Sequence, residues 1–294
     1  MNRRKFIVQS GIVASLAYAA PGTLLSSHNV KAKNIGLQLY TVRDLMSSNA
    51  LDTLKQVAKI GYKHVECAGY RNGMFYGYDR KAFKTILDDL GLKMYSGHAM
   101  TGFGMPEGTF SMTHKWDQYC EDAAYVGQKY IVCAYFMDGE RKTADDYKKI
   151  ADLFNTCAET AKKYGLQFCH HNHDFEFFKV DGEVPYDILL NRTDKKLVKF
   201  EIDHYWTKKA GVDSIQLMKD HPGRFPLFHI KDMDNTPKQA FTEVGTGVID
   251  WKSIFSVSEK AGMDLYFVEQ DACVKMPPME SIAVSFANLN AMAF

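Results

Sequence analysis

The chain has 294 residues, 46% of them hydrophobic, and its 36 Lys and Arg residues offset 35 Asp and Glu residues to a net charge of +1. A chain of this length and composition buries a sizeable core, which excludes an intrinsically disordered protein. A balanced charge disfavours general nucleic-acid binding, and no apolar run reaches the roughly 20 residues of a membrane span. We therefore expect no nucleic-acid partner and no stable membrane span.

The N-terminal segment has the pattern of an export signal. Arg3 and Arg4 form an arginine pair, and the stretch from Phe6 to Ala20 is short and only moderately apolar, which fits a signal better than a membrane span. We predict a twin-arginine-like signal and leader over residues 1–32, export to the periplasm, and a folded domain over residues 33–294. A cytoplasmic protein with a basic N-terminus is the alternative.

The body of the chain alternates short apolar runs with amphipathic stretches at a nearly regular interval. The runs are rich in β-branched and aromatic residues and are apolar enough to be covered on both faces, as parallel strands are. Between them, apolar residues recur at helical spacing. The eight runs begin near Ile35, His64, Lys93, Tyr130, Leu166, Val198, Pro226 and Leu265.

Glycines punctuate this alternation. Six of them stand a few residues before a predicted strand, where the end of a helix needs a left-handed residue: Gly61, Gly91, Gly127, Gly165, Gly223 and Gly262. Eight such units predict an α/β fold, a single (β/α)8 TIM barrel with its active site at the C-terminal face of the strands. An open doubly wound sheet is the alternative, but the first strand is followed by no G-x-G-x-x-G motif for a dinucleotide.

The predicted strand ends are dense in ionisable side chains, which are costly inside apolar runs unless they are paired or bind a metal. The alternation of strand residues places Glu201 with Asp203 on one face and points His170 away from His171. Asp, His and Glu at consecutive strand ends suit a divalent transition metal with open positions. The ionisable residues at or just after these ends are Glu66, His98, His171, His173, Glu176, Glu201, Asp203, His229, Lys231, Glu269 and Asp271.

Several of these motifs occur together in one family. From about Asn34 onward the chain resembles the sugar phosphate isomerase/epimerase superfamily with the xylose isomerase-like barrel. The resemblance implies one divalent ion, with Mn favoured and Mg, Co or Zn possible, held by His171, Asp203, His229 and Glu269. It is carried by GLQLY at 36–40, HNHDFEF at 171–177, Asp203, HIKD at 229–232, EVGTG at 243–247, IDW at 249–251 and VEQD at 268–271.

Two departures set this chain apart from the ketose 3-epimerases of that superfamily. Those enzymes have Glu where this chain has His171, and His where it has Trp206, so one carboxylate of their acid/base pair is missing here. The His-rich fifth strand and the sequence His229-Ile230-Lys231-Asp232 look more like the inosose dehydratase side of the superfamily.

The resemblance implies a metal-dependent isomerase, epimerase or lyase that works through an enediolate. Because we predict an export signal and because no Gly-rich phosphate loop follows the last strands, we expect an unphosphorylated sugar, keto-sugar or keto-glycoside, with β-elimination as one outcome. Glu269 is the first candidate base, His173 or Glu66 the partner acid, and Lys231 the group that neutralises developing charge. The side chains expected to contact a carbohydrate substrate are Glu176, Trp206, His98 and Glu243.

Two other functional classes stay open at this point. One is a non-catalytic sugar-binding barrel, and the other is an enzyme resembling an abasic-site endonuclease, which the balanced charge disfavours. A homo-oligomer is also compatible with the sequence.

Overall fold

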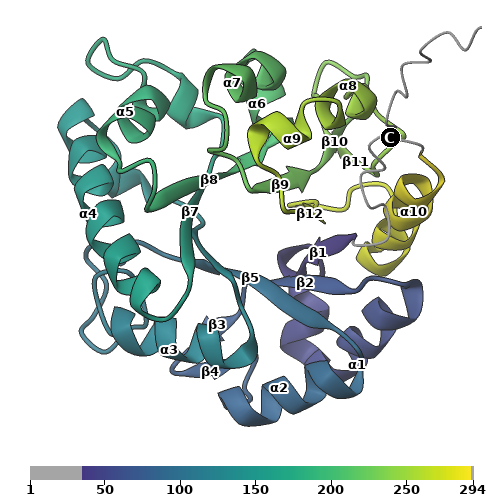
Figure 1. Cartoon of the computed structure of the whole chain (residues 1–294). Helices are drawn as coiled ribbons and strands as arrows, with labels where there is room; N and C mark the ends of the chain where they lie inside the picture. Colours follow the sequence, from purple (N-terminus) through teal and green to yellow (C-terminus); the bar gives the residue numbers. More distant parts are fainter. Residues whose placement is uncertain (1–34, 293–294) are drawn as a thin grey trace, which may run out of the picture.

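The computed structural model describes residues 35–292, which form a closed parallel barrel surrounded by helices (Figure 1). The predicted (β/α)8 TIM barrel is confirmed, and the predicted signal at residues 1–32 lies outside the described residues. Around the barrel the strands follow the order β1-β12-β9-β8-β7-β6-β5-β2. The barrel strands are β1 (Gly36–Gln38), β2 (His64–Cys67), β5 (Lys93–Ala99), β6 (Tyr130–Cys133), β7 (Gln167–His171), β8 (Val198–Asp203), β9 (Leu227–Ile230) and β12 (Leu265–Val268).

Helices connect consecutive barrel strands on the outside, and short hairpins lie in two of the connections. Within residues 35–292, no helix is long and apolar enough to cross a membrane. The hairpins pair β3 (Tyr70–Arg71) with β4 (Met74–Phe75) and β10 (Asp232–Met233) with β11 (Phe241–Thr242). The helices are α1 (Arg43–Ile60), α2 (Arg80–Asp89), α3 (Trp116–Val126), α4 (Ala144–Lys163), α5 (Pro185–Arg192), α6 (His204–Lys209), α7 (Ser214–Asp220), α8 (Trp251–Phe255), α9 (Ser258–Ala261) and α10 (Pro278–Ala291), with 3-10 turns η2 (Leu39–Val42), η3 (Asp138–Glu140) and η4 (Phe175–Phe177).

The helix ends follow the local sequence. Thr143 begins α4 with a capping box, in which its hydroxyl accepts from Asp146 N and the Asp146 carboxylate accepts from Thr143 N. All six predicted glycines have positive φ, between +64° and +125°. At Gly262 the reason is also steric, because a Cβ there would lie 3.0 Å from the backbone of Gly223.

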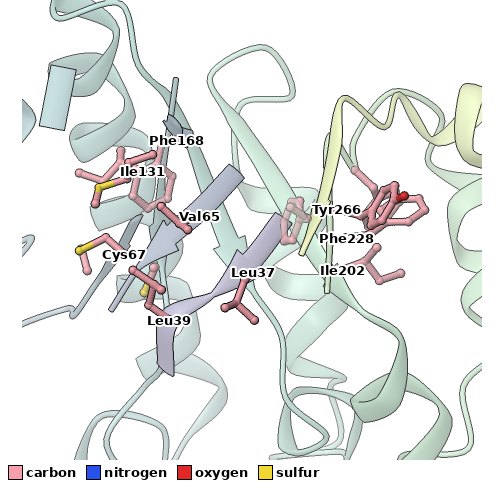
Figure 2. Packing of buried hydrophobic residues seen from close by; sticks show 14 of the residues in the cluster. Leu37, Leu39, Val65, Cys67, Ile131, Phe168, Ile202, Phe228 and Tyr266 are labelled. Atoms are coloured by element: carbon pink, nitrogen blue, oxygen red, sulfur yellow. The ribbon is translucent and has the colours of Figure 1, made fainter. Parts of the chain in front are cut away.

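The main hydrophobic core lies between the barrel and the helices. Alternate strand residues point outward into it, and Figure 2 shows several of them. The ring of Phe168 on β7 lies 5.1 Å from that of Phe154 on α4, and Tyr266 on β12 lies 5.1 Å from Phe255 on α8. Complete burial of such a side chain stabilises the fold by about 1.5–3 kcal/mol.

The other set of strand residues points into the barrel, where an apolar layer lies below a polar one. The apolar layer is a separate cluster that contains Cys169, Leu227 and Phe267. Moving two residues further along the same strands gives His171, His229 and Glu269, because every second residue faces the same side. The barrel interior therefore presents ionisable groups at its C-terminal end, supported by a packed apolar floor.

Candidate active site

Three imidazoles and two carboxylates form the inner polar layer. Glu201 Oε2 lies 3.0 Å from His98 Nε2, 3.1 Å from His171 Nδ1 and 3.1 Å from His229 Nε2. Glu66 Oε2 lies 2.6 Å from His229 Nε2 and 3.3 Å from His98 Nε2. Both carboxylates are fully buried. The layer is thus a compact ionic network contributed by five different strands.

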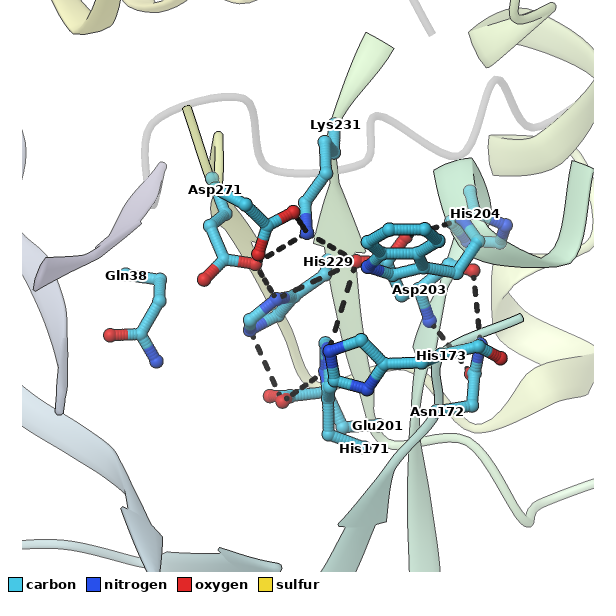
Figure 3. Close-up of polar contacts among 12 residues, drawn as sticks. Gln38, His171, Asn172, His173, Glu201, Asp203, His204, His229, Lys231 and Asp271 are labelled. Atoms are coloured by element: carbon cyan, nitrogen blue, oxygen red, sulfur yellow. Dashed lines mark hydrogen bonds and ion pairs between the residues drawn. The ribbon is translucent and has the colours of Figure 1, made fainter. Parts of the chain in front are cut away.

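A second polar layer lies nearer the mouth and is organised by Lys231. Its ammonium lies 3.0 Å from Asp203 Oδ2, 2.8 Å from Glu269 Oε2 and 2.7 Å from Asp271 Oδ2. Figure 3 shows Lys231 between Asp271 and Asp203, with His229 beneath. Glu269 Oε2 also lies 2.9 Å from His229 Nδ1, which joins the two layers. The fully buried ammonium offsets one of the three negative charges that these carboxylates carry when ionised.

Local structure fixes the orientation of the Asp203 carboxylate. Asp203 ends β8 and caps α6, so its Oδ1 accepts from Trp206 N at 2.9 Å. Its backbone N–H donates to Asn172 Oδ1 at 3.0 Å, which ties the end of β8 to the loop after β7. The buried Oδ2 has no hydrogen-bond partner apart from its ion pair with the Lys231 ammonium at 3.0 Å, and it points toward Lys231 and the imidazoles. The helix cap therefore holds one oxygen and directs the other into the site.

Burial and charge shift the pKa values of these groups in opposite directions. Burial, followed by the nearby His229, holds the pKa of His171 well below its usual range, so this imidazole is neutral at neutral pH. Burial disfavours charge on His98 as well, but the Glu66 and Glu201 carboxylates outweigh it and raise the pKa of His98 to about 10. Burial raises the pKa of Asp203 to about 6, against the lowering effect of Lys231.

A cavity of about 420 Å³ opens above these layers at the C-terminal face of the barrel. Its polar lining includes His98, His171, His173, Glu269 and Asp271. Much of the remaining wall is aromatic, a surface suited to stacking on a sugar ring: Tyr40, Tyr70, Phe110, Tyr119 and Tyr135. The volume lies within the range of small-molecule sites.

The four predicted metal ligands come together. His171, Asp203, His229 and Glu269 each offer one donor atom, and these atoms all lie within 4.8 Å of one another. Two imidazoles and two carboxylates fit a divalent transition metal. One of these carboxylate oxygens, Asp203 Oδ2, has no well-formed hydrogen bond. A second group of donors one layer deeper, formed by His98, His171, Glu201 and His229, is equally compact.

The other predicted catalytic and substrate residues divide into two groups. His98, His173 and Glu269 line the cavity, and Trp206 lies beside it with its ring 5.3 Å from that of His173. Lys231 is fully buried behind Glu269 and Asp271.

Three of the carboxylates predicted to act in catalysis or substrate binding are not among the described residues that line the cavity. Glu66 lies in the inner layer, where Gln38 Nε2 also donates to it at 2.8 Å. Glu176 accepts from His173 N at 2.9 Å, and Glu243 accepts from Ser281 Oγ at 3.0 Å. Each of the three carboxylates thus has an oxygen in a buried contact, while Glu66 Oε1 and Glu176 Oε1 have no hydrogen-bond partner.

Sequence reasoning gave no role to three residues that the geometry places in the network. Glu201 and Asp271 were visible as strand-end acids, and their spacing of two residues from Asp203 and Glu269 was the available signal. Gln38 on β1 has no ionisable residue two positions away on its strand, and a single Gln in an apolar strand does not by its residue type indicate a contact with a buried carboxylate.

A family model for the xylose isomerase-like TIM barrel matches residues 54–283. The chain belongs to this family. The alternation of strands, the closed barrel and the ionisable C-terminal face described above are all consistent with that membership.

The family relatives include inosose dehydratases. One from Clostridium perfringens is 26% identical over 152 residues, which cover 45% of this chain and 50% of that relative. The chain therefore spans about half the length of the first curated relatives that it matches. A further inosose dehydratase, from Histophilus somni, is 23% identical over 289 residues, with 84% of this chain and 94% of the relative covered.

Solved structures share the fold over nearly the whole chain. A sugar phosphate isomerase/epimerase from Parabacteroides distasonis is 27% identical, has a TM-score of 0.76 and covers 88% of this chain and 98% of its own. A structure described as IOLI protein with a binding zinc atom is 18% identical, with a TM-score of 0.70 and coverage of 89% and 99%. The second likeness shows the fold alone.

Proposed function

We propose that the protein is a divalent-metal-dependent enzyme that removes a proton next to a carbonyl of an unphosphorylated sugar, keto-sugar or keto-glycoside. One observation carries the proposal: His171, Asp203, His229 and Glu269 converge from four consecutive barrel strands, and two of them, His171 and Glu269, line the cavity. The inosose dehydratase relatives and the zinc in the IOLI structure support it. Mn is the favoured ion, as the family resemblance implies.

The ion would be held by those four residues and would supply electrophilic polarisation of a substrate carbonyl. Glu269 lines the cavity, and although burial raises its pKa, Lys231 and His229 outweigh burial and hold it well below its usual range. It is therefore an ionised carboxylate within reach of a bound sugar, as a general base requires. Lys231 keeps this charge compatible with burial.

His173 is the partner on the neighbouring wall. Burial, followed by the charge of Lys231, holds the pKa of His173 well below its usual range, so the ring enters the reaction neutral. Glu176 fixes its backbone and Tyr135 packs edge-on at 5.0 Å, so the ring position is defined by the fold. A neutral imidazole accepts a proton in one step and returns it in the next.

The proposed reaction begins when Glu269 takes the proton from the carbon next to the carbonyl, which leaves an enediolate. Protonation of the same carbon from the opposite face inverts it, and protonation of the neighbouring carbon interconverts aldose and ketose. In β-elimination, the carbon–oxygen bond at the next carbon breaks, a double bond forms, and the leaving oxygen takes up the proton that Glu269 removed, to depart as water or an alcohol. The loss of the Glu found at the His171 position in ketose 3-epimerases favours elimination.

Metal binding and proton abstraction are tested separately. Elemental analysis of protein purified without chelator is expected to give about one ion per chain, lost in His171→Ala and Asp203→Ala but kept in Asp152→Asn, which changes only a surface ion pair with Arg192. Candidate keto-sugars and 3-keto-glycosides are then incubated in D₂O with Mn²⁺. We expect deuterium at the carbon next to the carbonyl, together with an unsaturated product.

Absence of both deuterium exchange and product, with the ion bound, would refute the enzymatic proposal and favour a sugar-binding barrel. Isomerised product alone would refute elimination. Export to the periplasm is proposed separately on the Arg3-Arg4 signal, and cell fractionation of the full chain tests it.

A further inference from the structure

The Glu201 carboxylate lies within hydrogen-bond distance of three imidazoles. It is fully buried on β8, and three ring nitrogens lie 3.0–3.1 Å from its Oε2. Its Oε1 has no hydrogen-bond partner. Glu201 does not line the cavity, and two of its three imidazoles belong to the proposed ligand set. Its contacts therefore lead to the metal site and not to the substrate.

The position of Glu201 determines which nitrogen of His171 carries a proton. A neutral imidazole has one N–H and one lone pair, and a carboxylate only accepts. His171 Nδ1 lies 3.1 Å from Glu201 Oε2, whereas His171 Nε2 lies 3.9 Å from Asp203 Oδ2, beyond hydrogen-bond distance. The proton is therefore on Nδ1, and the Nε2 lone pair is directed toward Asp203.

His229, unlike His171, has a carboxylate within hydrogen-bond distance of each ring nitrogen. Nε2 lies 2.6 Å from Glu66 Oε2 and 3.1 Å from Glu201 Oε2, which favours an N–H there. Nδ1 lies on the opposite edge of the ring, 2.9 Å from Glu269 Oε2, in the outer donor set. In the ion-free chain, His229 therefore donates from both nitrogens, and Nδ1 becomes free for a ligand role only when the ion takes the place of its proton beside Glu269.

We propose that Glu201 is a positioning residue that sets the tautomer of His171 and holds the Nε2–H of His229, so that His171 Nε2 and His229 Nδ1 face the divalent ion beside Asp203 and Glu269. This inference rests on the proposed function for the existence of the ion. Carboxylates that orient metal-bound imidazoles raise their basicity, and loss of such a partner weakens metal binding about 10–100-fold. The opposing arrangement uses Glu201, His98, His171 and His229 directly as ligands of an ion in the inner layer.

Two measurements on the full chain test the inference. Long-range ¹H–¹⁵N correlation spectra of ion-free, ¹⁵N-histidine-labelled protein report the tautomer of His171, assigned by its absence in His171→Asn. Zn²⁺ affinity is measured by competition with a chelator, and Zn content by elemental analysis. We compare wild type with Glu201→Gln, Glu201→Asp and, as a matched control, Glu243→Gln, which neutralises a buried carboxylate whose contacts are Thr242 and Ser281.

We expect an Nδ1–H tautomer for His171 in wild type and in Glu243→Gln, and a mixture of tautomers in Glu201→Gln. The Zn²⁺ Kd is expected to rise about 10–100-fold in Glu201→Gln, with a smaller rise in Glu201→Asp, which keeps the charge. Should Glu201→Gln fail to fold, the Glu201→Asp comparison carries the test.

An unchanged His171 tautomer and an unchanged Kd in the folded Glu201 variants would overturn the inference. So would two Zn per wild-type chain with one lost in Glu201→Gln, because Glu201 would then be a ligand. Failure of the proposed function is distinguishable, since a wild-type chain that binds no ion still gives a His171 tautomer in the ion-free spectrum.

Discussion

Asp232 offers the sharpest test of how the fold holds the loop above β9. Its buried carboxylate accepts five hydrogen bonds at 2.8–3.2 Å, and all but one come from a segment that follows β11. Oδ1 accepts from the backbone N–H groups of Met233 and Ile249, and Oδ2 accepts from those of Gly245 and Gly247 and from the indole N–H of Trp251.

Replacing Asp232 with Asn keeps the shape but supplies only one acceptor oxygen. The oxygen is best placed at the Oδ2 position with its three donors, which leaves two backbone N–H groups facing an NH₂. A stranded buried donor costs about 1–3 kcal/mol, and the remaining hydrogen bonds lose their charge assistance. We therefore expect the free energy of unfolding to fall by about 4 kcal/mol.

Urea unfolding followed by far-UV circular dichroism measures this change, with the midpoint read at constant slope. Asp234→Asn is the matched control, because the Asp234 carboxylate likewise accepts several hydrogen bonds, three in number, but is partly exposed to water. We expect the control to change stability by less than about 1 kcal/mol. A similarly small change in Asp232→Asn would refute the reasoning that the buried carboxylate organises this loop.

Three further predictions concern stability. Lys231→Met is expected to lower the free energy of unfolding of the ion-free chain by about 3–5 kcal/mol, because it leaves buried carboxylates without their cation. Lys148→Met, at an exposed ion pair, should lower it by less than about 1 kcal/mol in urea unfolding, and equal losses in the two variants would contradict the role of burial. Gly262→Ala should lower the free energy of unfolding by about 1 kcal/mol more than Gly165→Ala does. Both glycines have positive φ, but only at Gly262 would a Cβ contact a backbone neighbour, so equal urea midpoints would argue against a steric contribution. Burial, with Lys93 nearby, lowers the pKa of His64 to about 4. As the pH falls from 6.5 to 4, the unfolded chain therefore binds a proton at His64 before the folded chain does, and the free energy of unfolding falls by up to about 3 kcal/mol. His64→Gln should flatten that part of the pH profile of stability, and an unchanged slope would contradict the assignment.

Much of the candidate site was predictable because strand alternation is a local property. Glu201 and Asp203 share a face for this reason, as do His229 and Lys231, and His170 turns outward to stack on Phe136 at 4.8 Å. The roles of Glu66, Glu176 and Glu243 were not predictable, because whether a strand-end carboxylate reaches the cavity depends on the partners that surround it.

The sequence by itself determined the eight strands, the helix ends and the inward face of each strand, because periodicity and glycine placement act within a few residues. Only the tertiary structure decided the height along the barrel axis at which each inward-facing side chain lies. In the barrel, His171 pairs with Glu201, and Asp203 pairs with His229. This stagger follows from the tilt of the strands in a closed barrel. It brings Glu201 beneath the imidazoles, leaves Asp203 above them, and sets Glu66 beside His229 across 163 residues of chain.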